Sequence, residues 1–262
     1  MPDTPPLRVA VVGASAGLGR CIGTGLADRG ARVAFLARRR DRLERAAKEA
    51  GNDAVAVVCD VTVAANCQNA MSEVVGALGG LDALVYTTGM GVLAPLRDVT
   101  AEQWAKLFAT NVTGASLVTA AAAPHLAAAA GSAVYLSSLS ASYTTPWPML
   151  GAYAVTKAAL DKLVEAWRIE HPEIGFTRLA VGDSLGGTGD AQTEFNKAWD
   201  PEVLETAIRY WMDNKYMVGG LVDAEHLTEM INAIIRCGNS SSIPYLTLVP
   251  RASDAVKVLR KW

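Results

Sequence analysis

The chain has 262 residues, 51% of them hydrophobic, and a formal net charge of -2. This near balance of charge points neither to a nucleic-acid partner nor to a membrane surface. The four cysteines, Cys21, Cys59, Cys67 and Cys237, form no Cys-x-x-Cys pair, so we expect reduced thiols and no disulfide or zinc site.

The predicted elements alternate between strand and helix along the chain. Apolar runs predict strands at 8–12, 31–37, 54–59, 83–86, 133–136, 175–181 and 245–249. Helical periodicity covers 17–28, 41–50, 64–78, 101–130, 152–170 and 224–236, with an interruption or kink of the long helix near Pro124. Near-continuous apolar strands between helices predict an α/β fold, a doubly wound parallel sheet of about seven strands with helices on both faces.

No linker rich in Pro, Gly or Ser divides the chain, so residues 1–262 are predicted to form one domain. The exception to the alternation is 182–221, an aromatic-rich stretch that follows the carboxyl end of a strand, where such folds bind ligands. We expect this stretch to be a substrate lid. The alternative is a pair of helices packed on the edge of the domain.

Two stretches bear on the location of the protein. The N-terminus is short, polar and proline-containing, so a cleaved signal peptide is not expected. The apolar tract 114–136 contains Pro124 and His125 and breaks at Gly131-Ser132, which fits a buried helix followed by a strand better than a membrane span. We expect a soluble cytoplasmic protein with no membrane partner.

A glycine-rich turn joins the first predicted strand to the first predicted helix. Its sequence is Gly13-Ala14-Ser15-Ala16-Gly17-Leu18-Gly19. Glycines in this context permit a tight turn and a close backbone approach, and the free N–H groups at the start of the helix attract a pyrophosphate. We expect phosphate binding here; a simple tight turn is the alternative.

Tyr153 and Lys157 lie four residues apart in a predicted helix. They therefore share one face, where a cation would favour the phenolate and lower the tyrosine pKa. This makes Tyr153 a candidate general acid or base. The spacing also occurs by chance in many helices, so its weight depends on the rest of the chain.

Several motifs stand in the order and at the intervals typical of one family. They are the glycine turn, Asp60-Val61 after the third strand, Asn111-Val112 in the long helix, Ser138 at the end of the fifth strand, and Tyr153 with Lys157. Over nearly its whole length the chain resembles the short-chain dehydrogenase/reductase (SDR) family. The resemblance implies a Rossmann fold and a nicotinamide-dependent oxidoreductase.

The resemblance also implies roles for four catalytic residues. Tyr153 would donate the proton in reduction, and Ser138 would hydrogen-bond the substrate oxygen as negative charge develops on it. Lys157 would lower the pKa of Tyr153 and hold the nicotinamide ribose, while Asn111 would keep the water that connects Lys157 to solvent. Ser140 is the alternative to Ser138, because the interval from serine to tyrosine most common in the family selects it. Each role has a structural alternative: Asn111 could simply be a buried polar residue, and Ser138 could only satisfy backbone groups at the end of its strand.

Further residues would hold the cofactor. Asp60 would accept a hydrogen bond from the adenine amino group, or else cap the helix that follows, and Val61 would lie against the ring. The family's Asn-Asn-Ala-Gly is Tyr86-Thr87-Thr88-Gly89 here, a departure in a segment that braces the cofactor loops and covers the nicotinamide, with Gly89 retained. The family's Thr before the first glycine and its Pro-Gly after the sixth strand are replaced as well, by Val12 and by Val181-Gly182. Thr188 is the candidate for contact with the carboxamide.

The end of the second strand decides which cofactor is expected. Ala37 occupies the usual acidic position, Arg38 follows it, and Ser15 adds a hydroxyl from the glycine turn. An arginine there accommodates the 2'-phosphate of NADP, so we expect NADP(H). We expect Arg39 and Arg40 to be a solvated helix start.

The expected function is NADPH-dependent interconversion of a carbonyl and an alcohol on a hydrophobic small molecule, with Tyr153 as acid and base. Trp147, Met149, Met90 and the lid aromatics favour an apolar substrate, although core packing would explain them equally well. Two alternatives stay open: a catalytically degenerate NADP(H)-binding sensor or scaffold, and an SDR-type epimerase or dehydratase. We expect no metal site, no nucleic-acid partner, and a homodimer or homotetramer formed through the alanine-rich helix and the helix that carries Tyr153.

Overall fold

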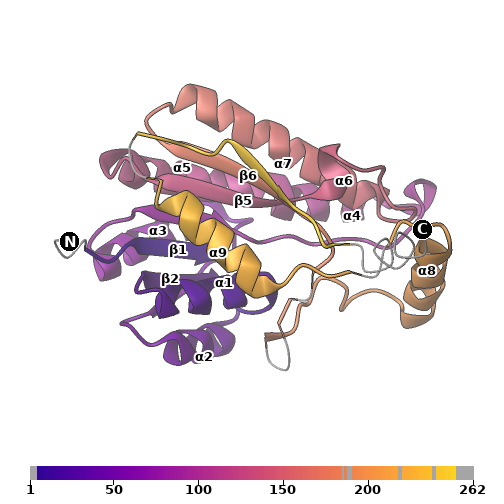
Figure 1. Cartoon of the computed structure of the whole chain (residues 1–262), viewed down its shortest axis with the longest axis horizontal. Coiled ribbons are helices and arrows are strands. Elements are labelled where there is room, and N and C mark those ends of the chain that lie inside the picture. The colour runs from indigo at the N-terminus through magenta and orange to yellow at the C-terminus, as the bar shows by residue number, and fades with distance from the viewer. Residues whose placement is uncertain (1–4, 185, 188–190, 218–219, 238–239, 252–262) are drawn as a thin grey trace, which may run out of the picture.

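The computed structural model describes residues 5–184, 186–187, 191–217, 220–237 and 240–251. Its centre is a parallel sheet with the strand order β3-β2-β1-β4-β5-β6-β7, which confirms the predicted doubly wound fold (Figure 1). The seven strands are β1 (Arg8–Val12), β2 (Arg32–Ala37), β3 (Val55–Val58), β4 (Ala83–Tyr86), β5 (Ser132–Ser138), β6 (Gly175–Val181) and β7 (Tyr245–Leu248).

Helices cover both faces of the sheet, which is why the strands are apolar almost throughout. In β1, Val9 and Val11 face one hydrophobic cluster while Ala10 and Val12 face the other, and all four are fully buried. The first face is covered by α1 (Gly17–Asp28), α2 (Arg40–Ala50) and α9 (Ala224–Ile235), and the second by α3 (Ala64–Leu78), α5 (Gly114–Ala128) and α7 (Gly151–Glu170). Period-two burial on two covered faces explains why no polar alternation appears in the sequence.

The predicted long helix departs from regular geometry at a different place from the one expected. Pro124 lies inside α5, which continues to its end at Ala128. The interruption comes earlier, in a π-helical turn, η2 (Ala109–Thr113), between α4 (Ala101–Phe108) and α5. Its physical reason is Asn111, whose side chain is hydrogen-bonded to Met90 and to Thr156 of α7 and so draws the turn toward them.

Strand β5 runs two residues beyond its predicted end. Ser137 and Ser138 pair with Ala180 and Val181 of β6, so backbone pairing extends the strand through a polar stretch. A short helix, α6 (Leu139–Ser142), follows at once, and the Ser138 side chain caps it by accepting from the N–H of Ser140. This arrangement fixes Ser138 at the carboxyl edge of the sheet.

The stretch 182–221 contains one helix among its described residues, α8 (Pro201–Asp213). Asp200 caps its N-terminus and Pro201 occupies the first helical turn, which is where both residue types are favoured. Figure 1 shows α8 beyond one end of the sheet, away from the helices that cover its faces. The short 3-10 helix η1 (Leu96–Asp98) precedes α4. None of the helices in the described ranges combines the length and the apolar character that crossing a bilayer requires.

Candidate active site

The predicted site residues come from strands that are neighbours in the sheet. Strand β1 lies between β2 and β4, and β5 lies next to β4, so the loops that follow these strands meet at one edge. From β1 the chain builds the sheet outward through β2 and β3, and it then returns to add β4 on the other side of β1. Folds of this kind bind ligands in the crevice at such a reversal of strand order. The glycine turn, the loop at Gly89 and Ser138 are therefore brought to the same edge.

The glycine turn is packed too tightly for larger residues. Gly13 has a φ of +92°, and a Cβ added at Gly19 would come within 2.6 Å of Gly13 O and closer still to Thr87 Oγ1. Thr87 itself donates a 2.8 Å hydrogen bond to Val12 O. Thr87, which departs from the family pattern, thus braces the turn. The N-terminus of a helix such as α1 is a favourable place for a pyrophosphate, although Gly17 and Gly19 are buried in this structure.

The expected adenine end of the site is built around Asp60. Its Oδ1 accepts hydrogen bonds from Thr62 N at 3.0 Å and from Thr62 Oγ1 at 2.7 Å, which stabilise the turn before α3. The alternative that Asp60 caps α3 is wrong, because the N-cap is Val63 and, within the described part of the chain, no side chain caps that helix. The hydrogen bonds from Thr62 lower the pKa of Asp60, and the charge of Arg38 contributes further. Val61 is only 6% exposed and packs in the core, so little of its side chain can touch an adenine ring.

Arg39 is not the solvated residue that the sequence suggested. Its Nη2 donates to Ser15 Oγ at 2.7 Å, and its Nη1 forms an ion pair with Glu194. Arg42 lies 2.9 Å from the same carboxylate, whereas Arg40 is exposed and lies 3.8 Å from Glu44 within α2. Arg42 and Glu194 were therefore not expected near the site from the sequence. The spacing of three residues between Arg39 and Arg42 at a helix start was an available signal, but nothing local pointed to a partner 155 positions away.

Tyr153 and Lys157 lie on one side of α7, as their spacing predicted. Lys157 is 3% exposed, its Nζ lies 5.7 Å from the centroid of the Tyr153 ring, and it donates a 2.7 Å hydrogen bond to Leu136 O. Burial raises the pKa of Tyr153 to about 12, opposed by a hydrogen bond with Ser138. Burial also lowers the pKa of Lys157 to about 8, opposed by the charge of Asp161. Both shifts favour the neutral forms, and the pKa of Tyr153 moves opposite to the lowering expected from Lys157.

The two candidate serines are hydrogen-bonded to each other. Ser138 Oγ and Ser140 Oγ are 3.0 Å apart, and Ser140 N donates to Ser138 Oγ at 3.3 Å. The hydrogen bond that affects Tyr153 comes from Ser138. Of the two serines, Ser138 is therefore the one that acts on the phenol, and Ser140 is bonded to Ser138.

Asn111 is fully buried, and its side chain makes three hydrogen bonds to protein groups. Its Oδ1 accepts from Met90 N at 2.8 Å, and its Nδ2 donates to Met90 O and to Thr156 Oγ1, both at 2.9 Å. The Oδ1 atom has a second lone pair, so these bonds leave it one acceptor site for a water. The side chain also fixes the loop at Gly89 to α7, and a Cβ added at Gly89 would lie 3.3 Å from Lys157 Nζ.

Aromatic residues of the stretch 182–221 cover the catalytic tyrosine candidate. The ring of Phe195 meets Tyr153 edge-on at a centroid distance of 5.0 Å, and Trp199 meets Phe195 in the same way at 5.1 Å. Trp199 Nε1 donates to Gly91 O at 3.0 Å, which ties the stretch to the loop after β4. Thr188, the candidate for the carboxamide, lies outside the described residues.

A second contact anchors α8 to the loop before α7. Trp211 is 3% exposed, its Nε1 donates to Pro148 O at 3.0 Å, and its ring lies 5.1 Å from that of Trp147. Tyr153 therefore lies beneath an apolar cover held at Gly91 on one side and at Pro148 on the other. This cover can exclude water from the phenol and the buried ammonium.

Comparison with known sequences gives a consistent result. A family described as short chain dehydrogenase matches residues 8–196. A protein named 11-beta-hydroxysteroid dehydrogenase-like 3 from Arabidopsis thaliana is 34% identical over 180 residues, which cover 66% of this chain and 58% of that protein. Dehydrogenase/reductase SDR family member 4 from Bos taurus is 33% identical over 208 residues, covering 77% of this chain and 72% of that protein. The match thus spans little more than half the length of the plant relative.

Solved structures share the architecture over almost the whole chain. A short-chain type dehydrogenase/reductase from Mycobacterium marinum has a TM-score of 0.80 at 25% identity, covering 94% of this chain and 95% of that one. A serine dehydrogenase in complex with NADP+ has a TM-score of 0.78 at 22% identity, covering 92% and 93%. A 3-ketoacyl-(acyl-carrier-protein) reductase from Brucella melitensis in complex with NADH has a TM-score of 0.78 at 23% identity, covering 95% and 100%. The last two are similar in fold alone, and they differ in cofactor.

Proposed function

The chain belongs to the short-chain dehydrogenase/reductase family, and on that premise we propose that it is an NADP(H)-dependent oxidoreductase acting on a carbonyl or alcohol of a hydrophobic small molecule. The observation that carries the proposal is the grouping of three side chains. Ser138 interacts with the Tyr153 phenol and opposes the rise of its pKa, and the Lys157 ammonium lies 5.7 Å from the ring centroid. A hydroxyl pair and a cation beneath an apolar cover suit proton transfer to a carbonyl oxygen.

The protein's own residues would orient the substrate and move one proton. When bound, the nicotinamide cofactor supplies or accepts the hydride. The Ser138 hydroxyl donates to the substrate oxygen, and Tyr153 O–H gives its proton to that oxygen as the carbonyl is reduced. A phenol with a pKa of about 12 stays protonated at neutral pH, as the proton donor in reduction must be. A lysine ammonium has three donors. Leu136 O takes one of them, and the nicotinamide ribose would take the others.

The choice of NADP(H) rests on the cations at the end of β2. Ala37 offers no carboxylate to a ribose 2'-hydroxyl, while Arg39 and Ser15 form one hydrogen-bonded unit beside the glycine turn. Arg38 is exposed next to Asp60, at the expected adenine end. Arg38→Ala and Arg39→Ala should each weaken NADPH binding more than NADH binding. An unchanged ratio of the two dissociation constants in both variants would refute the cofactor choice.

The proposal of a hydrophobic substrate rests on the aromatic cover. The ring of Phe195 contacts Tyr153 directly, and Trp199 contacts Phe195. Trp147 adds an aromatic ring in the loop before α7, against Trp211. Apolar pockets with a few convergent polar groups are typical of small-molecule sites. Some relatives carry names that refer to hydroxysteroids, which are themselves large and apolar, but those names describe other proteins.

The proposal is tested by turnover with NADPH. Purified protein should oxidise NADPH in the presence of members of a panel of apolar ketones and aldehydes, and Tyr153→Phe should abolish this activity. Tyr245→Phe is the matched control, since Tyr245 is 55% exposed and begins β7, at the opposite edge of the parallel sheet from Ser138. Full activity of Tyr153→Phe would refute the mechanism. Tight NADPH binding without turnover would favour a sensor or scaffold, and product formation without net change in the cofactor would favour an epimerase or dehydratase.

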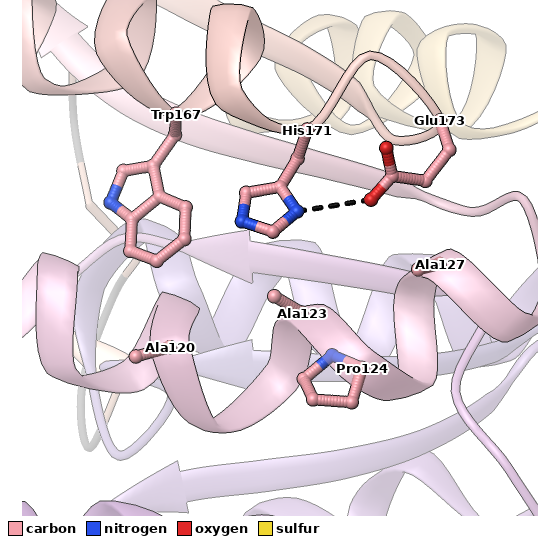
Figure 2. A pocket seen from close by; sticks show the side chains of 7 residues that line it. All are labelled: Ala120, Ala123, Pro124, Ala127, Trp167, His171 and Glu173. Atoms are coloured by element: carbon pink, nitrogen blue, oxygen red, sulfur yellow. Dashed lines mark hydrogen bonds and ion pairs between the residues drawn. The ribbon is translucent and has the colours of Figure 1, made fainter.

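We also propose that the protein is a cytoplasmic homodimer or homotetramer that associates through α5 and α7. Figure 2 shows a groove between them, lined by Ala120, Ala123, Pro124 and Ala127 of α5 and by Trp167 at the far end of α7 from Tyr153. Small side chains let two helices approach closely. Val155 and Ile169 on α7 are apolar and yet 46% and 77% exposed. Their exposure supports the proposal that a second subunit covers this face of α7. Light scattering should give two or four subunits, and Ile169→Glu should reduce that number.

A further inference from the structure

The carboxylate of Glu194 is held by three cations. Its Oε2 pairs with Arg39, and its Oε1 lies 2.9 Å from Arg42 Nη1 and 3.3 Å from Lys197 Nζ. The Glu194 side chain is 27% exposed, and those of Arg39 and Arg42 are 35% and 25% exposed, so these two contacts are partly shielded from water. Burial raises the pKa of Glu194, but hydrogen bonds from Arg39 and Lys197 outweigh it, and the net pKa lies below the usual range. Glu194 is therefore an anion at neutral pH.

The position of this anion relates it to the cofactor site. Arg39, which binds Glu194, also donates to Ser15 of the glycine turn. Thr193, the preceding residue, lies over that turn, because a Cβ added at Gly17 would come within 3.5 Å of Thr193 Cα. A Cβ added at Gly186 would lie 3.3 Å from Leu18 N at the start of α1. The segment thus lies on the phosphate-binding turn, with its carboxylate among the arginines at the end of β2.

From these contacts we infer that Glu194 competes with the 2'-phosphate of NADP(H) for Arg39 and Arg42. The inference rests on the proposed function, since it concerns the same cofactor. A phosphate and a carboxylate are alternative acceptors for the same guanidinium groups, and a phosphate brings more charge and more acceptor oxygens. NAD(H) carries a hydroxyl at that position, so its binding leaves the Glu194 ion pairs in place.

The competition has a consequence for the cover over the active site. Phe195, the next residue after Glu194, contacts Tyr153, and Trp199 beyond it is bonded to Gly91. Displacement of Glu194 by a phosphate therefore moves the segment that lies over the phenol. Binding of the 2'-phosphate and opening of the Phe195–Trp199 segment would then be coupled through Glu194. Glu194 would also set part of the preference between NADP(H) and NAD(H).

The experiment measures cofactor binding and requires no turnover. NADPH and NADH are titrated by calorimetry into the full chain, into Glu194→Gln, and into Glu205→Gln as a control. Glu205 pairs with Arg209 on exposed α8 and lies outside the arginine cluster. Glu194→Gln should tighten NADPH binding by at least about 5-fold, the lower end of the range of about 5- to 150-fold that is typical of coupled sites. It should change NADH binding less than about 2-fold. The control should change neither.

A second readout follows the segment itself. NADP+ should change the fluorescence of Trp199, taken as the difference between the full chain and Trp199→Phe, and NAD+ should not. The oxidised cofactors are used because reduced nicotinamide absorbs tryptophan emission. An unchanged ratio of NADPH to NADH affinity in Glu194→Gln, or an equal fluorescence change with both cofactors, would overturn the inference. If the unmodified chain shows no preference for NADPH and Glu194→Gln creates one, the competition stands and the proposed cofactor choice fails. If Arg39→Ala removes an existing preference that Glu194→Gln leaves untouched, only the competition fails.

Discussion

Lys157 Nζ lies 5.7 Å from the centroid of the Tyr153 ring and donates its 2.7 Å hydrogen bond to Leu136 O. The ammonium is therefore anchored to the backbone of β5 while it remains close to the phenol. One helical turn further along α7, Asp161 is 4% exposed and accepts from Ser142 and Arg178. Helix α7 thus presents a proton donor, a cation and an anion at successive turns, and the anion supports the cation.

The first prediction concerns the pH dependence of reduction. Lys157 has a pKa of about 8, lowered by burial and partly restored by Asp161, so its charge is present below pH 8 and lost above it. The value of kcat/KM for carbonyl reduction should therefore fall above about pH 8. In Asp161→Asn the carboxylate is gone, the pKa of Lys157 drops, and the fall should begin at lower pH. A pH–rate profile of both proteins measures this.

Glu165→Gln is the control for the prediction on Asp161. Glu165 also lies on α7, and it is 3.2 Å from Arg178, the arginine that contacts Asp161. Its removal disturbs the same arginine without removing the charge nearest to Lys157. A profile of Asp161→Asn that keeps its fall near pH 8, or an equal shift in Glu165→Gln, would contradict the role given to Asp161.

The second prediction separates Ser138 from Ser140. Ser138 opposes the rise of the Tyr153 pKa, while Ser140 is hydrogen-bonded to Ser138. Ser138→Ala should lower kcat by about 100- to 1000-fold, as does loss of a donor to a developing oxyanion. Ser140→Ala should lower it less than about 10-fold, since its effect passes through Ser138. The reverse order of the two effects would assign the catalytic role to Ser140.

The third prediction concerns the packing of the glycine turn. A Cβ at Gly19 would come within 2.6 Å of Gly13 O, so Gly19→Ala should destabilise the fold by about 1–3 kcal/mol. It should also weaken cofactor binding, because the turn must shift. Gly76→Ala in α3 is the control: a Cβ there meets nothing within 4 Å, and the change should stabilise the helix by about 1 kcal/mol. Urea unfolding of both variants measures the pair, and equal effects would contradict the packing argument.

Features set by local spacing could be predicted from the sequence. Strand, glycine turn and helix follow one another within residues 8–28, and Tyr153 and Lys157 are one helical turn apart, so periodicity alone aligned them. The order of these motifs along the chain pointed to the family, and the family implied the fold. The end of β5 was missed because Ser137 and Ser138 are polar and join the strand only through their pairing with β6.

Features set by contacts between distant segments could not be predicted. Glu194 meets Arg39 across 155 residues, and the sequence offered no reason to join them. Thr87 looked like a departure that weakened the cofactor loops, yet its hydroxyl braces Val12. The long helix was expected to break near Pro124, but it departs from α-helical geometry at Asn111. In each case a side chain that hydrogen-bonds the backbone or the side chain of a remote segment overrode the local signal.

The last prediction is a pH-dependent stability that arises from Asp183. Burial raises its pKa to about 6, and among the described residues no cation or hydrogen-bond donor contacts its carboxylate. Because the folded state holds the proton more tightly than the unfolded chain, this group stabilises the fold fully below about pH 4, and its contribution is lost as the pH rises through 6. Asp183→Asn should therefore be more stable than the parent at pH 7.5, by about 1–3 kcal/mol, and similar to it at pH 4.5. Urea unfolding across this range tests the difference, with Asp213→Asn at the exposed end of α8 as a control for the charge change. If the stabilities of the parent and of Asp183→Asn change in parallel from pH 4.5 to 7.5, Asp183 does not carry this pH dependence.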